Sequence, residues 1–147
     1  MSTQRGGLIL RLLTAAALVI DASVHLHLAP QYQAAAPSGI GQGTLFLAEA
    51  VAAILAALFV LITGSRAAYA VALAIAASAF VAVMLYRYVD IPAIGPIPSM
   101  YEPIWYFEKA LSAVAEGFGT VLAIVGFTRA RHRRLGAIRP FLRHGSP

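Results

Sequence analysis

The sequence contains no cysteine among its 147 residues. Disulfide bonds, thiolate metal sites and thiol redox pairs are therefore excluded, because each of them needs cysteine sulfur. Charged residues are also scarce, since they make up 12% of the chain, whereas about a quarter of the residues of a soluble domain are charged. Hydrophobic residues account for 60%, and the mean hydropathy is +0.78. This composition predicts an integral membrane protein.

Acidic residues are absent after Glu116, and the segment 130–147 is instead rich in arginine. The formal net charge of +5 could indicate nucleic-acid binding, but six of the eleven lysines and arginines lie together from Arg129 onwards. We predict that 130–147 is a basic cytoplasmic tail that contacts anionic lipid headgroups, each arginine adding about 1 kcal/mol near the membrane surface. Nucleic acid is not an expected partner.

Four long apolar segments follow one another along the chain, at residues 8–28, 44–63, 67–89 and 104–128. Each has about 20 residues or more, which is enough for a helix to cross a ~30 Å hydrocarbon core. None of them alternates as the strands of a membrane barrel do, and their many alanines allow close helix packing in lipid. We predict an all-α fold, an integral membrane four-helix bundle over residues 1–129.

Proline and glycine mark the predicted breaks between these helices. Pro30 is expected to end the first helix and open a loop over 29–43. The tripeptide Gly-Ser-Arg at 64–66 predicts a tight turn and an antiparallel hairpin, and four prolines predict a second loop at 91–103. The first segment is too long and too charged for a cleaved signal peptide, so we expect it to remain as a helix.

The distribution of arginine predicts how the bundle is oriented, because arginine favours the cytoplasmic ends of membrane helices. With four crossings, nearly all the arginines fall on one side, and only Arg87 and Lys109 lie towards the other. Both termini are therefore predicted to be cytoplasmic, in a multi-pass protein of the bacterial cytoplasmic membrane. The arginines on that side are Arg5, Arg11, Arg66 and six between Arg129 and Arg143.

All the acidic residues fall, on this topology, in the outer half of the membrane, at its outer edge or near its middle. Asp21 and His25 are four residues apart and share a helix face, whereas His27 points about 200° away from His25 and is expected at the rim. Glu49 lies at a depth similar to that of Asp21. A carboxylate at a helix centre costs about 2.5–3.5 kcal/mol, so we expect these groups to face the interior and find partners. The acids are Asp21, Glu49, Asp90, Glu102, Glu108 and Glu116.

The fourth segment carries a polar stripe at helical spacing. Its members are Glu102, Trp105, Lys109, Ser112 and Glu116, with Glu108 at the edge. We expect Lys109 to lie at the membrane interface, where it can pair with an acid, while Glu116 lies close to the midplane. Arg87 is expected to snorkel outward or to pair with Asp90 or Glu49. The neighbouring tyrosines and Trp105 are typical of an aromatic belt at the outer surface.

This outer cluster allows two functional interpretations and one structural one. In the first, a metal such as Zn, Mn or Fe is held by carboxylate and imidazole groups, with Asp21, His25, Glu49 and Glu108 as ligands. In the second, the cluster relays protons or holds a polar ligand in a cavity open to the outside. In the third, the groups only form buried ion pairs that fix helix register. The ligand- or proton-binding candidates are Asp21, His25, Glu49, Arg87, Glu108 and Glu116, and no catalytic residue is predicted.

The stretch at 45–83, LFLAEAVAAILAALFVLITGSRAAYAVALAIAASAFVAV, resembles the DoxX-like small four-helix bacterial membrane proteins. In that group an acid opens the second helix and a Gly-x-Arg-type turn leads into an alanine-rich third helix. Here Glu49 and the turn at 64–66 fill those places. The resemblance implies an accessory subunit linked to respiration or quinone chemistry, with a quinone as the implied cofactor.

Three hypotheses follow for the function. The first is a non-enzymatic accessory or ligand-binding subunit, acting as a homo-oligomer or within a larger membrane complex. The second is a small oligomeric proton-coupled transporter. The third is a metal-dependent membrane enzyme acting on a lipid or quinone, and it lacks a complete ligand motif such as HExxH.

Overall fold

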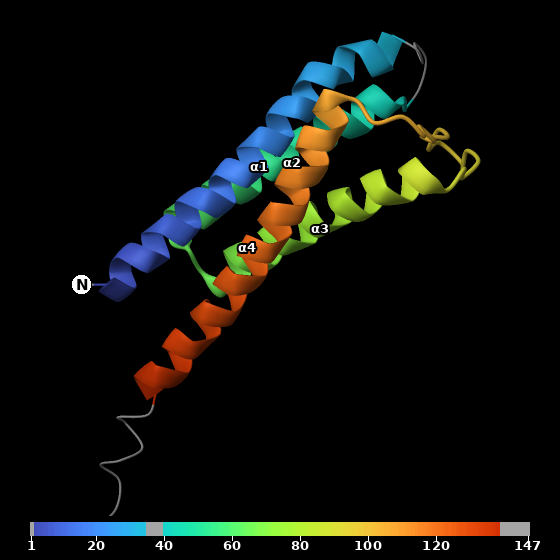
Figure 1. Ribbon diagram of the computed structural model, residues 1–147. Coiled ribbons are helices and arrows are strands. Elements are labelled where there is room, and N and C mark those ends of the chain that lie inside the picture. Colours follow the sequence, from blue (N-terminus) through green and yellow to red (C-terminus); the bar gives the residue numbers. More distant parts are fainter. Residues whose placement is uncertain (1, 35–39, 139–147) are drawn as a thin grey trace, which may run out of the picture.

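The computed structural model describes residues 2–34 and 40–138, and side chains within 4–34 and 40–130. Helices dominate these ranges, and the one pairing of extended residues within them is an isolated bridge between Ile94 and Ile97. The predicted all-α fold is confirmed (Figure 1). The four helices are α1 (Ser2–Ala34), α2 (Gln42–Thr63), α3 (Arg66–Tyr88) and α4 (Phe107–Ile138).

Helix α1 runs through Pro30 to Ala34, so the prediction that proline ends this helix is wrong. Proline removes one backbone hydrogen bond from a helix, and contacts with neighbouring segments offset that loss here. A Cβ at Gly43 would contact Ala29 O, which means that the start of α2 lies directly against this turn of α1. The Thr44 hydroxyl also donates to Gln33 Oε1 at 2.9 Å. Tertiary packing thus holds the last turn of α1 in place.

Helix α4 begins three residues later than predicted, at Phe107 instead of residue 104, and continues past the predicted end at 128 to Ile138. The apolar segment predicts which residues cross the membrane, but the helix can extend beyond it. The arginines that follow favour helix, because arginine has a high helix propensity. The start of the segment predicted as a tail is therefore helical. The remainder, residues 139–147, lies outside the described residues.

The turn between α2 and α3 is the tight connection that its sequence predicts. Gly64 has φ +51°, a left-handed conformation that favours glycine, and its N–H donates to Val60 O at 2.8 Å. The Ser65 side chain accepts a hydrogen bond from the Ala68 N–H at 3.1 Å and so caps α3. The Arg11 guanidinium of α1 lies against Gly64, where a Cβ would collide with it.

The helices share two ends, which differ in what joins them. We call the end with Gly64 and Ser65 the turn end, and the end with the loop 89–106 the loop end. Both the start of α1 and the last turns of α4 lie at the turn end (Figure 1). Helix α1 packs mainly on α2 and α4, and α3 packs mainly on α4. In Figure 1 the part of α3 nearer the loop end diverges from α1 and α2.

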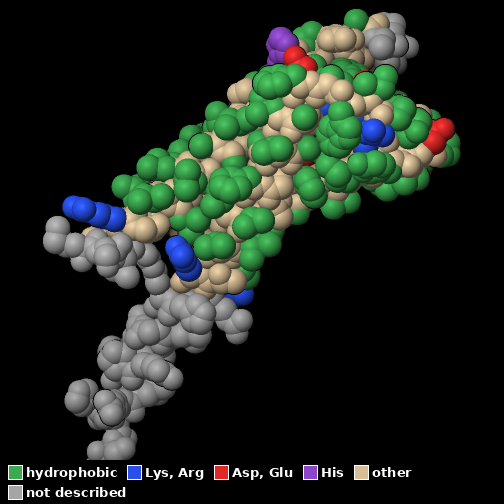
Figure 2. All heavy atoms as spheres, in the orientation of Figure 1, with side chains coloured by type: hydrophobic (Ala, Val, Ile, Leu, Met, Phe, Trp, Pro, Cys, Tyr) green, Lys and Arg blue, Asp and Glu red, His purple; other side chains and the backbone are tan. Residues whose placement is uncertain are grey.

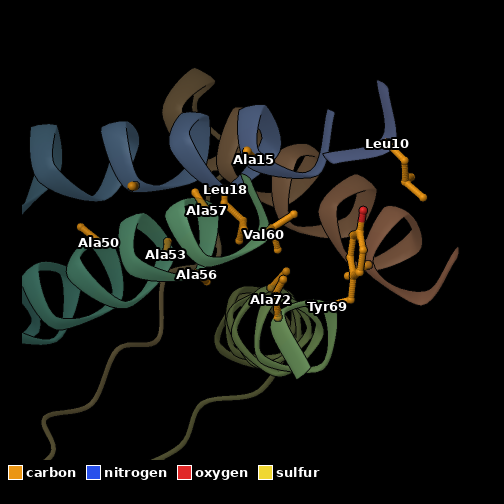
Figure 3. Close-up of a cluster of buried hydrophobic side chains, with 14 residues drawn as sticks. Leu10, Ala15, Leu18, Ala50, Ala53, Ala56, Ala57, Val60, Tyr69 and Ala72 are labelled. Atoms are coloured by element: carbon orange, nitrogen blue, oxygen red, sulfur yellow. The ribbon is translucent and has the colours of Figure 1, made fainter. Parts of the chain in front are cut away.

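The hydrophobic core fills the bundle towards the turn end and is built mostly from alanine (Figure 3). Leu18 and Val60 are its largest fully buried apolar side chains. A Cβ at Gly126 would overlap the Tyr69 ring, so the ring of α3 rests directly on the backbone of α4. The expected close packing through small residues is confirmed by this contact.

The outer surface of the bundle is largely apolar. All four helices are long and apolar enough to cross a membrane, with mean hydropathies of 1.9, 2.7, 2.3 and 1.7 in chain order. On the face drawn in Figure 2, hydrophobic side chains cover the middle of the bundle, and charged side chains lie towards its two ends. Large side chains such as Leu55 and Ile62 are 61% and 77% exposed, as expected of helices that face lipid.

Candidate functional site

A cavity of about 560 Å³ lies at the loop end, where α3 diverges from the rest of the bundle. Its walls are mainly apolar, with Leu45 and Phe46 from α2 facing Ala82 and Val83 from α3. Polar side chains line the remainder of the cavity. They are His25, Gln42, Glu49, Ser78, Tyr86, Glu102, Tyr106, Lys109, Ser112 and Glu116.

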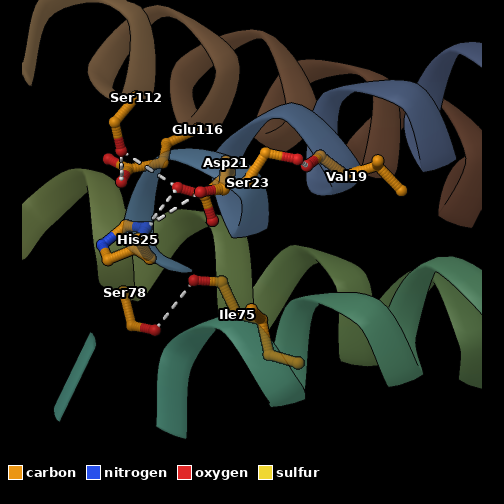
Figure 4. A network of polar contacts seen from close by, with 8 residues as sticks. All are labelled: Val19, Asp21, Ser23, His25, Ile75, Ser78, Ser112 and Glu116. Atoms are coloured by element: carbon orange, nitrogen blue, oxygen red, sulfur yellow. Dashed lines mark hydrogen bonds and ion pairs between the residues drawn. The ribbon is translucent and has the colours of Figure 1, made fainter. Parts of the chain in front are cut away.

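Four polar side chains from α1 and α4 converge at one side of this cavity (Figure 4). Asp21 and Glu116 are almost completely buried, with 1% and 2% of their surface exposed. Ser112 lies between them, with its Oγ 3.0 Å from Asp21 Oδ1 and 2.6 Å from Glu116 Oε1. His25 completes the group, with its Nδ1 3.0 Å from Asp21 Oδ1. We call these four residues the polar cluster.

The polar cluster has too few hydrogen-bond donors for the oxygen atoms of its two carboxyl groups. The His25 Nδ1 faces both Asp21 Oδ1 and the Asp21 carbonyl, at 3.0 and 3.1 Å, and must carry its proton because both of these atoms accept. Ser112 has a single hydroxyl proton for two carboxyl groups. Asp21 Oδ2 and Glu116 Oε2 are buried and have no hydrogen-bond partner among the described residues. Such groups are costly unless a proton, a cation or a polar ligand joins them.

Glu49, on α2, also lines the cavity and is half-buried. Its Oε1 is buried and has no partner among the described residues. Asp21 and His25 are both near enough to act on its charge electrostatically. Glu49 therefore adds a third carboxyl group with an unsatisfied oxygen to the same end of the bundle.

Lys109 points towards the α3–α4 loop instead of towards Glu116. Its Nζ donates to the Glu102 carbonyl at 2.5 Å and lies 3.9 Å from Glu102 Oε2. The expectation that Lys109 can pair with an acid is confirmed, and the acid is Glu102. The residue is only 7% exposed, so protein atoms surround most of this side chain.

Three side chains join α1 to the loop between α3 and α4, and we call them the tyrosine latch. The Tyr32 hydroxyl donates to Glu102 Oε2 at 2.7 Å and lies 2.8 Å from the Tyr106 hydroxyl. The Tyr106 hydroxyl donates to Glu102 Oε2 at 3.3 Å. Burial raises the pKa of Tyr106 above its ordinary value, and the negative charge of Glu102 acts in the same direction. Tyr106 is therefore a neutral hydrogen-bond donor at any physiological pH.

Arg87 was expected either to snorkel outward or to pair with Asp90 or Glu49, and within the described part of the chain it forms neither of those ion pairs. Its guanidinium carbon lies 5.0 Å from the centre of the Tyr88 ring and 5.7 Å from that of Trp105. Aromatic rings of the expected outer belt thus hold the charge by cation–π contact. This arrangement leaves Arg87 outside the polar cluster.

One further predicted member of the cluster, Glu108, needs correction, whereas His27 lies outside the cluster as expected. Glu108 does not line the cavity and is absent from the group of candidate metal ligands, which is Asp21, His25 and Glu116. Its position lies about 100° around α4 from the inward-facing Lys109, because one residue turns a helix by that angle. His27 is exposed, as the helix geometry predicted, whereas His25 faces the interior.

Sequence reasoning missed how two sets of residues act together. Ser112 was assigned to the polar stripe, and its spacing of four residues from Glu116 was the signal that it could bond that acid. Tyr32 and Tyr106 carried no comparable signal, because they are 74 positions apart in the chain. Comparisons of the chain with protein-family models, with curated proteins and with solved structures find no match.

Proposed function

We propose that the chain is a polytopic membrane protein whose loop-end cavity binds a small amphipathic molecule, and that it acts as an accessory subunit without catalysis of its own. The observation that carries this proposal is the cavity itself, which combines apolar walls with buried polar groups. Cavities of ~300–1,000 Å³ with a few convergent polar groups are typical of small-molecule sites, and this one measures about 560 Å³.

The placement of charge supports a bacterial cytoplasmic membrane with the turn end inside. Arg11 and Arg66 lie at the turn end, and α4 carries its arginines in the same direction. The tail would then contact anionic lipid headgroups on the cytoplasmic side. The small size of the bundle and the DoxX-like resemblance favour a homo-oligomer or a subunit of a larger complex.

The absence of cysteine makes this topology directly testable. Single cysteines at Ser99 in the α3–α4 loop and at Ser146 in the tail can be labelled in intact cells with a maleimide that does not cross membranes. We expect labelling of Ser99→Cys in intact cells and of Ser146→Cys only after the cells are opened. Labelling in the reverse order would overturn the proposed orientation.

The charges around the cavity indicate the chemistry of the ligand's head group. Carboxyl groups outnumber cations there, and Lys109 is already bonded to Glu102. A ligand with a negative head group would therefore be repelled, whereas one that donates hydrogen bonds would satisfy an oxygen such as Glu49 Oε1. A quinol has two donating hydroxyl groups and an apolar tail. It is also the ligand that the DoxX-like resemblance suggests.

The experiment uses Trp105, the only tryptophan of the chain, as a fluorescent reporter beside Lys109 and Arg87. Purified protein in lipid nanodiscs is titrated with a short-chain quinol analogue in the presence of a chelator. We expect saturable quenching that is lost in Ala82→Phe, which fills the cavity. Val81→Phe is the matched control, because Val81 is 60% exposed and is not among the residues that line the cavity. Equal quenching in both variants would contradict the proposal.

Proton-coupled transport is a second candidate, favoured by the buried carboxyl oxygens beside the cavity. In this case Glu116 would exchange a proton as a cationic substrate enters, since a carboxyl group in the membrane interior can carry either. Vesicles with an imposed proton gradient test it, with a fluorescent lipophilic cation as the probe. Uptake or efflux that Glu116→Gln abolishes would favour transport over simple binding, and gradient-independent partitioning would exclude it.

A further inference from the structure

The three titratable members of the polar cluster are arranged as metal ligands are. Asp21, His25 and Glu116 each offer one ligand atom, and these atoms all lie within 4.8 Å of one another. Nitrogen and oxygen ligands bind Zn²⁺ at about 2.0–2.2 Å, which places neighbouring ligand atoms roughly 3.0–3.5 Å apart. The His25 Nδ1 lies 3.0 Å from Asp21 Oδ1 and holds a proton there, so a metal that binds this nitrogen must displace that proton. Small side-chain rotations would bring the third ligand to the same spacing.

The charge of the cluster favours a cation. Two fully buried carboxyl groups face a single imidazole, so the ionised cluster stays negative even when His25 is protonated. Neither of the other nearby cations compensates this charge, because Lys109 bonds Glu102 and Arg87 lies over Tyr88 and Trp105. An uncompensated buried charge costs several kcal/mol. Asp21 Oδ2 and Glu116 Oε2, both buried and unpartnered among the described residues, are available to bind the missing positive charge.

We propose that Asp21, His25 and Glu116 form a binding site for one divalent transition-metal cation of the Zn²⁺ or Mn²⁺ class. Imidazole and carboxylate ligands without sulfur suit these ions. Neighbouring side chains contact all three proposed ligands. Ser112 orients both carboxyl groups, and the His25 ring packs edge-on against Phe46 at a centroid distance of 5.0 Å.

The site would be incomplete on one side, as three protein ligands leave a coordination position open. His25 and Glu116 line the cavity, as does Glu49, whose Oε1 has no partner among the described residues. The open position would thus face the cavity, where Glu49, water or a ligand can occupy it. Compared with the ligands predicted from the sequence, this set contains Glu116 instead of Glu108. Glu49 is no longer one of the three ligands and is only a candidate for the open position.

The test measures metal bound to the purified full-length protein in detergent, with no quinol added. Protein is stripped with a chelator, exposed to Zn²⁺ or Mn²⁺, separated from free metal and analysed by mass spectrometry of the elements. We expect one cation per chain, held by nitrogen and oxygen ligands in X-ray absorption spectra. Asp21→Asn and Glu116→Gln should each weaken binding by more than about tenfold.

Controls separate this site from surface imidazoles. All the proteins compared, with the natural cluster or with a cluster variant, carry glutamine in place of the histidines outside the cluster. Glu108→Gln serves as the matched acid substitution on α4, since Glu108 is outside the ligand group. Circular dichroism checks that each variant folds. If replacing a fully buried acid prevents folding, His25→Gln provides the decisive variant. The background substitutions are His27→Gln, His132→Gln and His144→Gln.

Two results would overturn the proposal. One is that the protein with the natural cluster binds no stoichiometric metal under these conditions. Infrared spectra that show Glu116 still protonated after exposure to the metal would be the same result. The other is metal binding that persists unchanged in the cluster variants. The quinol titration is performed with a chelator present, so loss of metal binding leaves the proposed ligand cavity standing, and failure of quinol binding leaves the metal site standing.

Discussion

At the turn end the four helices meet through alanine and glycine, while at the loop end the same helices enclose a cavity of about 560 Å³ and buried carboxyl groups. The Tyr69 ring lies directly against the backbone at Gly126 in the first region, whereas Asp21 and Glu116 keep oxygens without partners among the described residues in the second. Close packing stabilises a fold, and unsatisfied buried oxygens destabilise it. We infer that the turn end carries the stability that allows the loop end to hold a site.

The largest expected effect comes from placing the same large side chain in each region of α3. Ala72 is fully buried in the core, so Ala72→Phe should lower the free energy of unfolding by about 3 kcal/mol or more through overpacking. Ala82 faces the cavity, so Ala82→Phe should cost less than about 1 kcal/mol, because apolar burial offsets it. Detergent unfolding followed by circular dichroism measures both. Equal losses would remove the distinction between the two ends.

A smaller effect tests the closest helix contact of the turn end. Gly126→Ala places a Cβ against the Tyr69 ring and should destabilise the protein by about 1–3 kcal/mol. Gly6→Ala is the matched control, because a Cβ there meets nothing within 4 Å. Alanine should stabilise that unobstructed helical position by up to about 1 kcal/mol. Thermal unfolding of the two variants should therefore shift in opposite directions, and shifts in the same direction would show that Tyr69 simply moves aside.

A third variant asks whether the polar cluster is held together by Ser112. Ser112→Ala removes the hydroxyl that bridges Asp21 and Glu116 and should cost about 1–3 kcal/mol, since buried acceptors lose their partner. Ser78→Ala is the control, because within the described part of the chain its hydroxyl donates to Ile75 O of its own helix, at 3.0 Å. Its removal should change the free energy of unfolding by less than about 0.5 kcal/mol. A stable Ser112→Ala variant would mean that the two carboxyl groups share a proton without the serine.

The turn end was the more predictable of the two regions. Its features follow from local sequence, since apolar length gives the helices, Gly64 allows the left-handed residue of the turn, and Ser65 caps the next helix. The helix boundaries at the loop end were less predictable. The local sequence at Pro30 predicts the end of a helix. Helix α1 continues because this turn packs against the start of α2, a contact that the local sequence does not show.

The candidate site could be predicted in part. Helix spacing brings Asp21 and His25 to one face and separates His27, and the structure agrees on each point. The choice of Glu116 over Glu108 depends on how α4 is rotated against α1. No spacing within one helix fixes that rotation, because it is set by packing between helices.

The smallest effect concerns the tyrosine latch, which closes the loop end by hydrogen bonds alone. Tyr106→Phe removes the hydroxyl that contacts Tyr32 and Glu102 and should cost about 0.5–1.5 kcal/mol at neutral pH. The folded protein keeps the Tyr106 proton more tightly than the unfolded chain, because burial raises the pKa of this group above 10.0. The contribution of the Tyr106 hydroxyl to the free energy of unfolding is therefore complete below about pH 10. It is lost as the pH rises towards the pKa of Tyr106 in the folded protein.

Tyr106→Phe should accordingly reduce the fall in stability that the wild-type protein shows above about pH 10. Tyr101→Phe is the control, because Tyr101 is 40% exposed in the same loop and has no part in the latch. Unfolding measured from pH 8 to 11 gives the two slopes, and equal slopes for wild type and Tyr106→Phe would show that the hydroxyl is not held neutral by burial. Since Tyr106 also lines the cavity, the same series shows whether weakening the latch opens the loop end without disturbing the core at the turn end.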